Sequence, residues 1–127
     1  MKIIKVVCGI IWRDGKILLA RKRPEKVLGG YWEFPGGKVE PNEEHITTLQ
    51  RELLEELGLE ISNIRYFATH LHAYETISIE LIAFQADFKD ATFQLKDHDK
   101  VEFVALSSLN DYRIAQADQY FLDRIKS

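Results

Sequence analysis

The first third of the chain alternates apolar runs with turn residues in a way that predicts paired strands. Two apolar segments rich in β-branched residues, Ile3–Trp12 and Lys16–Ala20, flank the pair Asp14 and Gly15. An Asp-Gly pair between two such runs favours the tight turn of a β-hairpin. After a basic stretch and a glycine-containing loop, Tyr31–Phe34 is expected to form a further short strand.

Next comes a segment with helical periodicity, which we expect to form a helix over Glu43–Leu57. Asn42 stands where a helix N-cap is favoured, and Gly58 stands where a left-handed residue ends a helix. The apolar residues recur at helical spacing and predict one buried stripe. This stripe consists of Ile46, Leu49, Leu53 and Leu57.

The remainder of the chain predicts three more strands and a second helix. Ile64–Leu71 and Thr76–Phe84 read as strands, and the polar segment Lys89–Lys100 reads as a loop. Val101–Leu106 is expected to form another strand, and Ile114–Ile125 a helix with one apolar face. Mixed strands with two principal helices imply an α/β sandwich, in which helices cover both faces of the sheet.

Composition and charge limit the classes of function. With 127 residues, 46% hydrophobic and 29% charged, the chain is expected to be one soluble domain over residues 1–127. A net charge of −3 argues against stable binding of nucleic acid, although a bound metal could still attract a nucleotide. The single cysteine, Cys8, suits a reducing cytoplasm, and we expect neither a signal peptide nor a membrane span.

Three carboxylates crowd the predicted first helix. Glu52, Glu55 and Glu56 fall within an arc of about 100° on an ideal helix. Like charges four residues apart destabilise a helix, so a cation is expected beside them, unless they form an ordinary solvated acidic face. Oxygen ligands of this kind suit Mg²⁺, with Mn²⁺ able to substitute. Arg51 can pair with Glu55 and help to orient it.

The full pattern resembles the signature of the Nudix hydrolases. The residues that fill the fixed positions of this signature are Gly37, Glu43, Arg51, Glu52, Leu53, Glu55, Glu56, Gly58 and Leu59. The segments Gly9–Ile11, Trp32–Glu40 and Ala117–Asp118 also resemble MutT-type nucleoside triphosphate pyrophosphohydrolases. The resemblance therefore extends over essentially the whole chain and implies a Nudix-type α/β/α sandwich with a mixed β-sheet.

The resemblance also implies a metal site and a reaction. Glu52, Glu55, Glu56 and the backbone carbonyl of Gly36 would bind Mg²⁺, and water would attack a phosphorus atom of the substrate. Two carboxylates are candidates for the general base, namely Glu52 and Asp97, which occupies the loop position where MutT-type proteins place an acidic residue. The neighbouring His98 is of a residue type that commonly transfers protons. The alternative is that this segment is simply a polar loop tip.

Basic residues near the N-terminal strands are candidates for phosphate binding. The resemblance favours Arg23, and Lys38 is a second candidate. Because the loop after Arg23 is about one residue shorter than in MutT-type relatives, Arg21 or Lys22 could take this role instead.

Asp118 occupies the place where MutT-type relatives carry an Asn or Asp that bonds the base, and Phe34 could pack against that base. An ionised Asp only accepts hydrogen bonds, from the amine of cytosine or the N–H groups of guanine. A protonated Asp118 could also donate to a purine oxygen. Both cytosine nucleotides and oxidised guanine nucleotides remain open.

The resulting expectation is Mg²⁺-dependent hydrolysis of a nucleoside or deoxynucleoside triphosphate to the monophosphate and pyrophosphate. Such an enzyme would clear 8-oxo-dGTP or non-standard cytosine nucleotides before a polymerase uses them. One alternative is a Nudix hydrolase for another nucleoside diphosphate derivative, such as a dinucleoside polyphosphate or a nucleotide sugar. The other is a non-catalytic, nucleotide-sensing Nudix module. We expect a monomer or a weak dimer.

Overall fold

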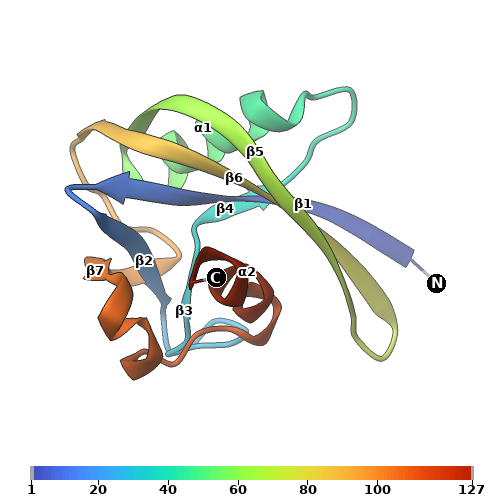
Figure 1. Cartoon of the computed structure of the whole chain (residues 1–127). Coiled ribbons are helices and arrows are strands. Elements are labelled where there is room, and N and C mark those ends of the chain that lie inside the picture. Colours follow the sequence, from blue (N-terminus) through green and yellow to red (C-terminus); the bar gives the residue numbers. More distant parts are fainter. Residues whose placement is uncertain (1, 127) are drawn as a thin grey trace.

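The computed structural model describes residues 2–126 as one sheet with two principal helices (Figure 1). In chain order the elements are β1 (Lys2–Arg13), β2 (Lys16–Lys22), β3 (Trp32–Glu33), β4 (Gly36–Lys38), α1 (His45–Leu57), β5 (Leu59–Ala73), β6 (Ile77–Ala91), β7 (His98–Ala105), the 3-10 helix η1 (Leu106–Asp111) and α2 (Gln116–Lys126).

The sheet is mixed, as expected. Its main path runs β3-β2-β1-β6-β5, with β4 paired to β1 and β7 paired to β2. β1 and β6 run parallel, whereas the other pairs are antiparallel. The hairpin between β1 and β2 turns at Asp14 and Gly15, whose φ angles are 51° and 76°. The Asp-Gly turn predicted from the sequence is therefore confirmed.

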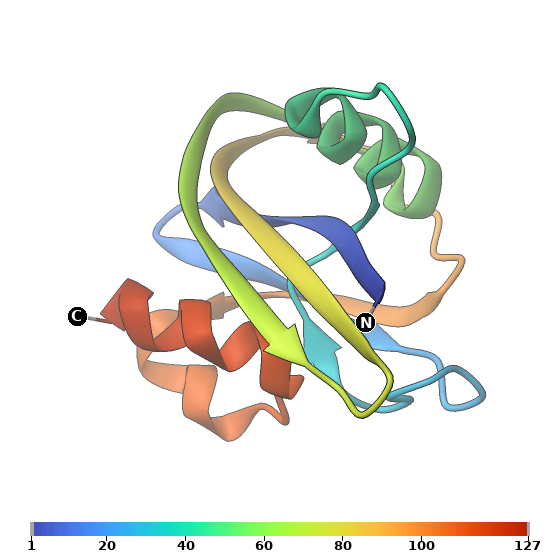
Figure 2. The same cartoon turned by 90° about the vertical axis from the view of Figure 1, so that its right-hand side faces the viewer.

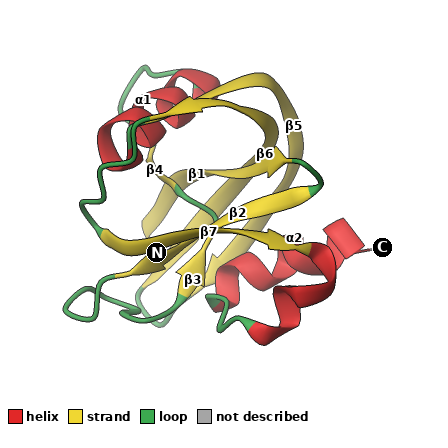
Figure 3. Ribbon diagram, turned by 90° about the vertical axis from the view of Figure 1, so that its left-hand side faces the viewer, coloured by secondary structure: helices red, strands yellow, loops and turns green. Residues whose placement is uncertain are grey.

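Helices cover both faces of the sheet, with α1 on one side of the strands and α2 on the other (Figure 2, Figure 3). Because successive strand residues point to opposite faces, β1 contributes to two separate cores. Val7 and Ile11 pack with the buried stripe of α1, while Cys8 and Ile10 pack with Phe121 and its neighbours on α2. This layering confirms the α/β sandwich.

The start of α1 differs from the prediction. The helix begins at His45 with Glu44 in the N-cap position, and Asn42 lies in a preceding turn with a φ of 62°. Asn42 was therefore wrongly predicted as the cap, since Asn also tolerates the left-handed conformation that this turn needs. Ile46 is 40% exposed and does not belong to the buried stripe, whereas Thr48 is fully buried.

Several strand bounds also differ from the prediction. β5 and β6 are 15 residues each and extend well beyond the predicted segments. As a result the predicted loop Lys89–Lys100 shrinks to residues 92–97 between β6 and β7. A short strand, β4, forms at Gly36–Lys38, where no strand was predicted. None of the helices within residues 2–126 is long and apolar enough to cross a membrane.

Candidate active site

Two consecutive glycines bring β4 against both β1 and α1. Gly36 and Gly37 pair with Cys8 and Val7 of β1. A Cβ atom on Gly36 would stand 1.9 Å from the carbonyl oxygen of Val7, and one on Gly37 would stand 2.2 Å from the carboxyl carbon of Glu52. The absence of side chains is therefore what lets the Glu52 carboxylate lie directly on the β4 backbone.

Arg51 holds three carboxylates at the α1 surface. Its guanidinium donates to Glu43 at 2.8 Å, to Glu52 at 3.0 Å and to Glu55 at 3.1 Å. The predicted pairing of Arg51 with Glu55 is confirmed. The hydrogen bonds from Arg51, followed by one from Thr48, lower the pKa of Glu43 to about 2. For Glu52, burial outweighs the guanidinium and raises the pKa of the carboxyl group.

Glu56 faces the loop that precedes β7. Its Oε2 atom is buried and has no hydrogen-bond partner among residues 2–126. Burial, and then the charge of nearby Asp97, raise the pKa of Glu56. Burial opposes ionisation of Asp97 as well, but the ion pair with Lys26 at 3.3 Å, the hydrogen bond with Glu56 and the charge of Lys22 together lower the pKa of Asp97. The structure therefore brings Asp97 to the acidic helix, although the two segments are distant in sequence.

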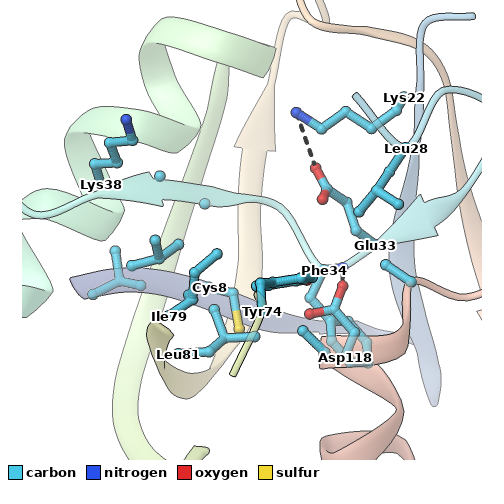
Figure 4. A pocket seen from close by; sticks show the side chains of 16 residues that line it. Cys8, Lys22, Leu28, Glu33, Phe34, Lys38, Tyr74, Ile79, Leu81 and Asp118 are labelled. Atoms are coloured by element: carbon cyan, nitrogen blue, oxygen red, sulfur yellow. Dashed lines mark hydrogen bonds and ion pairs between the residues drawn. The ribbon is translucent and has the colours of Figure 1, made fainter. Parts of the chain in front are cut away.

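A pocket of about 210 Å³ opens beside the two glycines (Figure 4). Four residues predicted from the sequence line it together, namely Phe34, Gly36, Lys38 and Asp118. Asp118 lies in the first turn of α2, is 5% exposed, and accepts a hydrogen bond from the backbone N–H of Phe34 at 3.2 Å. Burial, and then the charge of Glu33, raise the pKa of Asp118 well above its usual range.

The basic residues at this pocket are only partly those favoured by the sequence. Lys22 and Lys38 line the pocket, and Lys22 lies 3.9 Å from the Glu33 carboxylate (Figure 4). Arg21 pairs instead with Asp99 at 2.8 Å. Arg23 does not line the pocket, because its guanidinium donates to backbone carbonyl groups of the loop before β7.

Several lining residues were not found from the sequence. Glu33 carries a carboxylate into the pocket and is bonded at 2.8 Å to Nε2 of the buried His98. The period of a strand could have indicated Glu33, because it alternates with the buried residues Trp32 and Phe34. Leu28 and Tyr74 come from loops on either side, and no spacing rule connects those loops with the pocket.

As the side chains stand, no three His, Cys, Asp or Glu residues within the described part of the chain are grouped to hold a metal ion. Glu52 and Glu55 are turned toward Arg51, and Glu55 is 53% exposed. The carboxylates nevertheless share one surface, which runs from β4 across α1 to Asp97.

The chain is similar to known proteins. The sequence profile of the NUDIX domain matches residues 2–125. The chain belongs to the Nudix hydrolase family.

Two curated relatives and one solved structure show how this Nudix hydrolase compares. A CTP pyrophosphohydrolase of Escherichia coli (strain K12) is 41% identical over 118 residues, which cover 93% of this chain and 87% of that protein. An 8-oxo-dGTP diphosphatase of Buchnera aphidicola subsp. Schizaphis graminum is 42% identical over 79 residues, covering 62% of this chain and 61% of that protein. The crystal structure of a MutT NUDIX hydrolase from Burkholderia pseudomallei has a TM-score of 0.88 at 23% identity, with 98% of this chain and 99% of that chain covered.

The family resemblance and the Nudix fold expected from the sequence are thus confirmed. Because the family is shown and its members here are named a pyrophosphohydrolase and a diphosphatase, this Nudix chain is a hydrolase of pyrophosphate bonds.

Proposed function

We propose that this Nudix hydrolase cleaves a nucleoside or deoxynucleoside triphosphate to the monophosphate and pyrophosphate, with Mg²⁺ as cofactor. The observation that carries the proposal is the position of the pocket. The same hollow is lined by the buried Asp118 at one end and by Gly36, Gly37 and Lys38 at the other, next to the Glu52 carboxylate. A base held at Asp118 would place its phosphates over the acidic helix.

The residues on this surface suit Mg²⁺. Carboxylate and carbonyl oxygens are the ligands that this ion prefers, and the buried Oε2 of Glu56 has no partner of its own among residues 2–126. Glu52, Glu55, Glu56 and the carbonyl of Gly36 would hold the ion, and Mn²⁺ would be able to substitute. When bound, Mg²⁺ neutralises charge on phosphate oxygens and makes water a better nucleophile.

The chain's own side chains then have distinct roles. Lys22 and Lys38 line the pocket and would bind phosphate oxygens, and Arg51 would orient Glu52 and Glu55 through its hydrogen bonds. We assign proton acceptance from the attacking water to Asp97, whose pKa the ion pair with Lys26 helps to lower. Glu52, which Arg51 bonds at 3.0 Å, is the alternative base.

We propose cytosine as the preferred base of the substrate. Cytosine offers an amine donor beside two acceptors, N3 and O2. Glu33 can accept from the amine, and a protonated Asp118 can donate to an acceptor; burial favours the protonated form because it raises the pKa of Asp118. The relative that covers 93% of the chain is named a CTP pyrophosphohydrolase. The oxidised guanine nucleotide 8-oxo-dGTP is the second candidate, in keeping with the name of the Buchnera relative. Either substrate fits an enzyme that clears unwanted nucleotides from the cytoplasmic pool.

A nucleotide panel tests the choice of substrate. Pyrophosphate release with Mg²⁺ would be measured for CTP, dCTP, 5-methyl-dCTP, dGTP, 8-oxo-dGTP and a diadenosine polyphosphate. We expect cytosine nucleotides to give the highest kcat/KM, and Asp118→Ala to change that ranking while the need for Mg²⁺ remains. If no triphosphate releases pyrophosphate and the diadenosine polyphosphate is cleaved, the proposed substrate class is wrong.

A further inference from the structure

The segment that carries Asp97 has no regular structure of its own. Residues 92–97 connect β6 with β7, and their beginning is fixed by hydrogen bonds from the N–H groups of Thr92 and Gln94 to the end of α1. At the end of the segment, Asp97 interacts with the Glu56 side chain of α1 through both its carboxyl group and its backbone. What places the Asp97 carboxylate must therefore be sought among the side chains around it.

Arg23 holds the main chain on that side. Its guanidinium donates from Nε to the carbonyl of Lys96 and from Nη2 to the carbonyl of Leu95 at 3.2 Å. Its backbone N–H donates to the carbonyl of Asp97 at 3.1 Å. One residue thus bonds three consecutive carbonyl groups that end at the candidate base.

Lys26 holds the carboxylate itself. Its ammonium group lies 3.3 Å from Oδ1 of Asp97, and its backbone N–H donates to the carbonyl of Arg23 at 3.0 Å. Leu28, two residues further along the same loop, lines the pocket beside Asp118. The loop after β2 therefore touches both the pocket and Asp97.

These contacts conflict with the phosphate-binding role that the sequence favours for Arg23. Arg23 is absent from the pocket lining, where Lys22 and Lys38 provide the positive charge. A planar guanidinium suits the simultaneous bonding of two carbonyl groups, which a lysine cannot reproduce.

We infer that Arg23 and Lys26 are positioning residues that set the Asp97 carboxylate against the acidic helix, and that Arg23 is not a phosphate ligand. The inference rests on the catalytic role proposed for Asp97. Its consequence is that loss of Arg23 acts on turnover rather than on substrate binding, because a small displacement of a catalytic group can cost about 10²-fold in rate.

A double-mutant cycle in steady-state kinetics with CTP and Mg²⁺ tests this role. The variants are Arg23→Ala, Arg23→Lys, Asp97→Asn and the double variant Arg23→Ala/Asp97→Asn. Arg65→Ala is the matched control, because Arg65 also donates to a backbone carbonyl, that of Asn63 at 2.9 Å, but on β5. We expect both Arg23 variants to lower kcat on the order of 10- to 100-fold with KM little changed. In the Asp97→Asn background, Arg23→Ala should add no further loss.

A phosphate ligand would behave differently in each comparison. In Arg23→Ala, KM would rise. Arg23→Lys would keep most of the wild-type activity, because lysine still supplies a positive charge. In the double variant, the activity losses of the two single variants would multiply. Any of these results would overturn the inference. Lys26→Met, a change at a half-exposed side chain, gives an independent check if Arg23→Ala fails to fold, and it too should lower kcat with KM little changed. Unchanged kcat in Lys26→Met would overturn its positioning role.

Hydrogen exchange separates failure of the inference from failure of the proposed mechanism. Amides of residues 95–97 should exchange faster in Arg23→Ala than in Arg65→Ala, whatever the activity. Unchanged exchange would overturn the positioning role of Arg23. Full activity of Asp97→Asn would instead overturn the proton-acceptor assignment, and faster exchange in Arg23→Ala would then still support Arg23 as the residue that fixes this loop.

Discussion

The carboxylate of Glu52 lies against the backbone of Gly37, with its carboxyl carbon 2.2 Å from where a Cβ atom on Gly37 would stand. Gly37→Ala must therefore displace this carboxylate. Because the displaced group is the flexible end of a side chain, we expect thermal stability to change little. Activity should fall on the order of 10²-fold, since the group at the reacting centre moves.

The control for this substitution is Gly15→Asn in the β1–β2 turn, where the φ is 76° and no heavy atom lies within 4 Å of an added Cβ. Asn tolerates such a backbone, so this variant should retain activity. A fully active Gly37→Ala enzyme would contradict the position assigned to Glu52.

The ion pair between Arg51 and Glu43 predicts a specific loss of stability in acid. Since hydrogen bonds from Arg51 and Thr48 lower the pKa of Glu43 from its usual 4.5 to about 2, the unfolded chain takes up this proton at higher pH than the folded chain. The stabilisation is therefore present above the usual pKa and is lost as the pH falls toward 2. The difference in Tm between the wild type and Glu43→Gln should be largest at neutral pH and shrink over that range. A constant difference would show that Glu43 contributes only through packing.

For Asp118 we expect the stability of the folded protein to depend on pH in the opposite direction. Burial raises its folded-state pKa well above the usual 3.8, so the folded protein binds this proton more tightly than the unfolded chain. Its contribution is most favourable below the usual pKa and is lost as the pH rises. Asp118→Asn keeps an acceptor for the Phe34 N–H and carries no charge, so its Tm should exceed that of the wild type at pH 7. Each kcal/mol gained in the free energy of unfolding would raise the Tm by about 3–6 °C.

Differential scanning calorimetry between pH 4 and pH 8 would check this, with the exposed Asp123→Asn on the same helix as the control. A lower Tm for Asp118→Asn at neutral pH would mean that the buried carboxylate is stabilised by its surroundings.

Much of the fold follows from local signals in the sequence. The Asp14-Gly15 hairpin turn, the left-handed Gly58 at the end of α1 and the Arg51–Glu55 pair all depend on residues close in the chain. Those signals act over one turn of helix or one tight turn, and the structure confirms each of them.

The contacts that complete the site join distant segments, and local signals cannot give these. Asp97 lies near α1 because the chain returns toward that helix after the long strands β5 and β6. Glu33 is bonded to His98, which is 65 positions away in the sequence. The sequence favours Arg23 as a phosphate ligand, whereas in the structure its guanidinium bonds carbonyl groups of the loop before β7. Only its three-dimensional neighbours distinguish the two. The misplaced cap at Asn42 arose because the same residue type suits both a cap and a left-handed turn.

Removal of single carboxylates should separate the roles of Glu55 and Glu56. Glu56 has a buried oxygen without a partner among residues 2–126, whereas Glu55 is 53% exposed and bonded to Arg51. We expect Glu56→Gln to lower kcat about 10²- to 10³-fold and Glu55→Gln to lower it less, with both variants folded by circular dichroism. Near-normal rates in both would contradict the metal site proposed here.

The most direct test of the proposed reaction is identification of its products. Phosphorus NMR of CTP incubated with the enzyme and Mg²⁺ should show CMP and pyrophosphate in equal amounts. Neither product should form with excess EDTA, and the Glu56→Gln enzyme should form both far more slowly. Release of orthophosphate and CDP, or cleavage that persists in EDTA at the wild-type rate, would contradict a metal-dependent pyrophosphohydrolase centred on this helix.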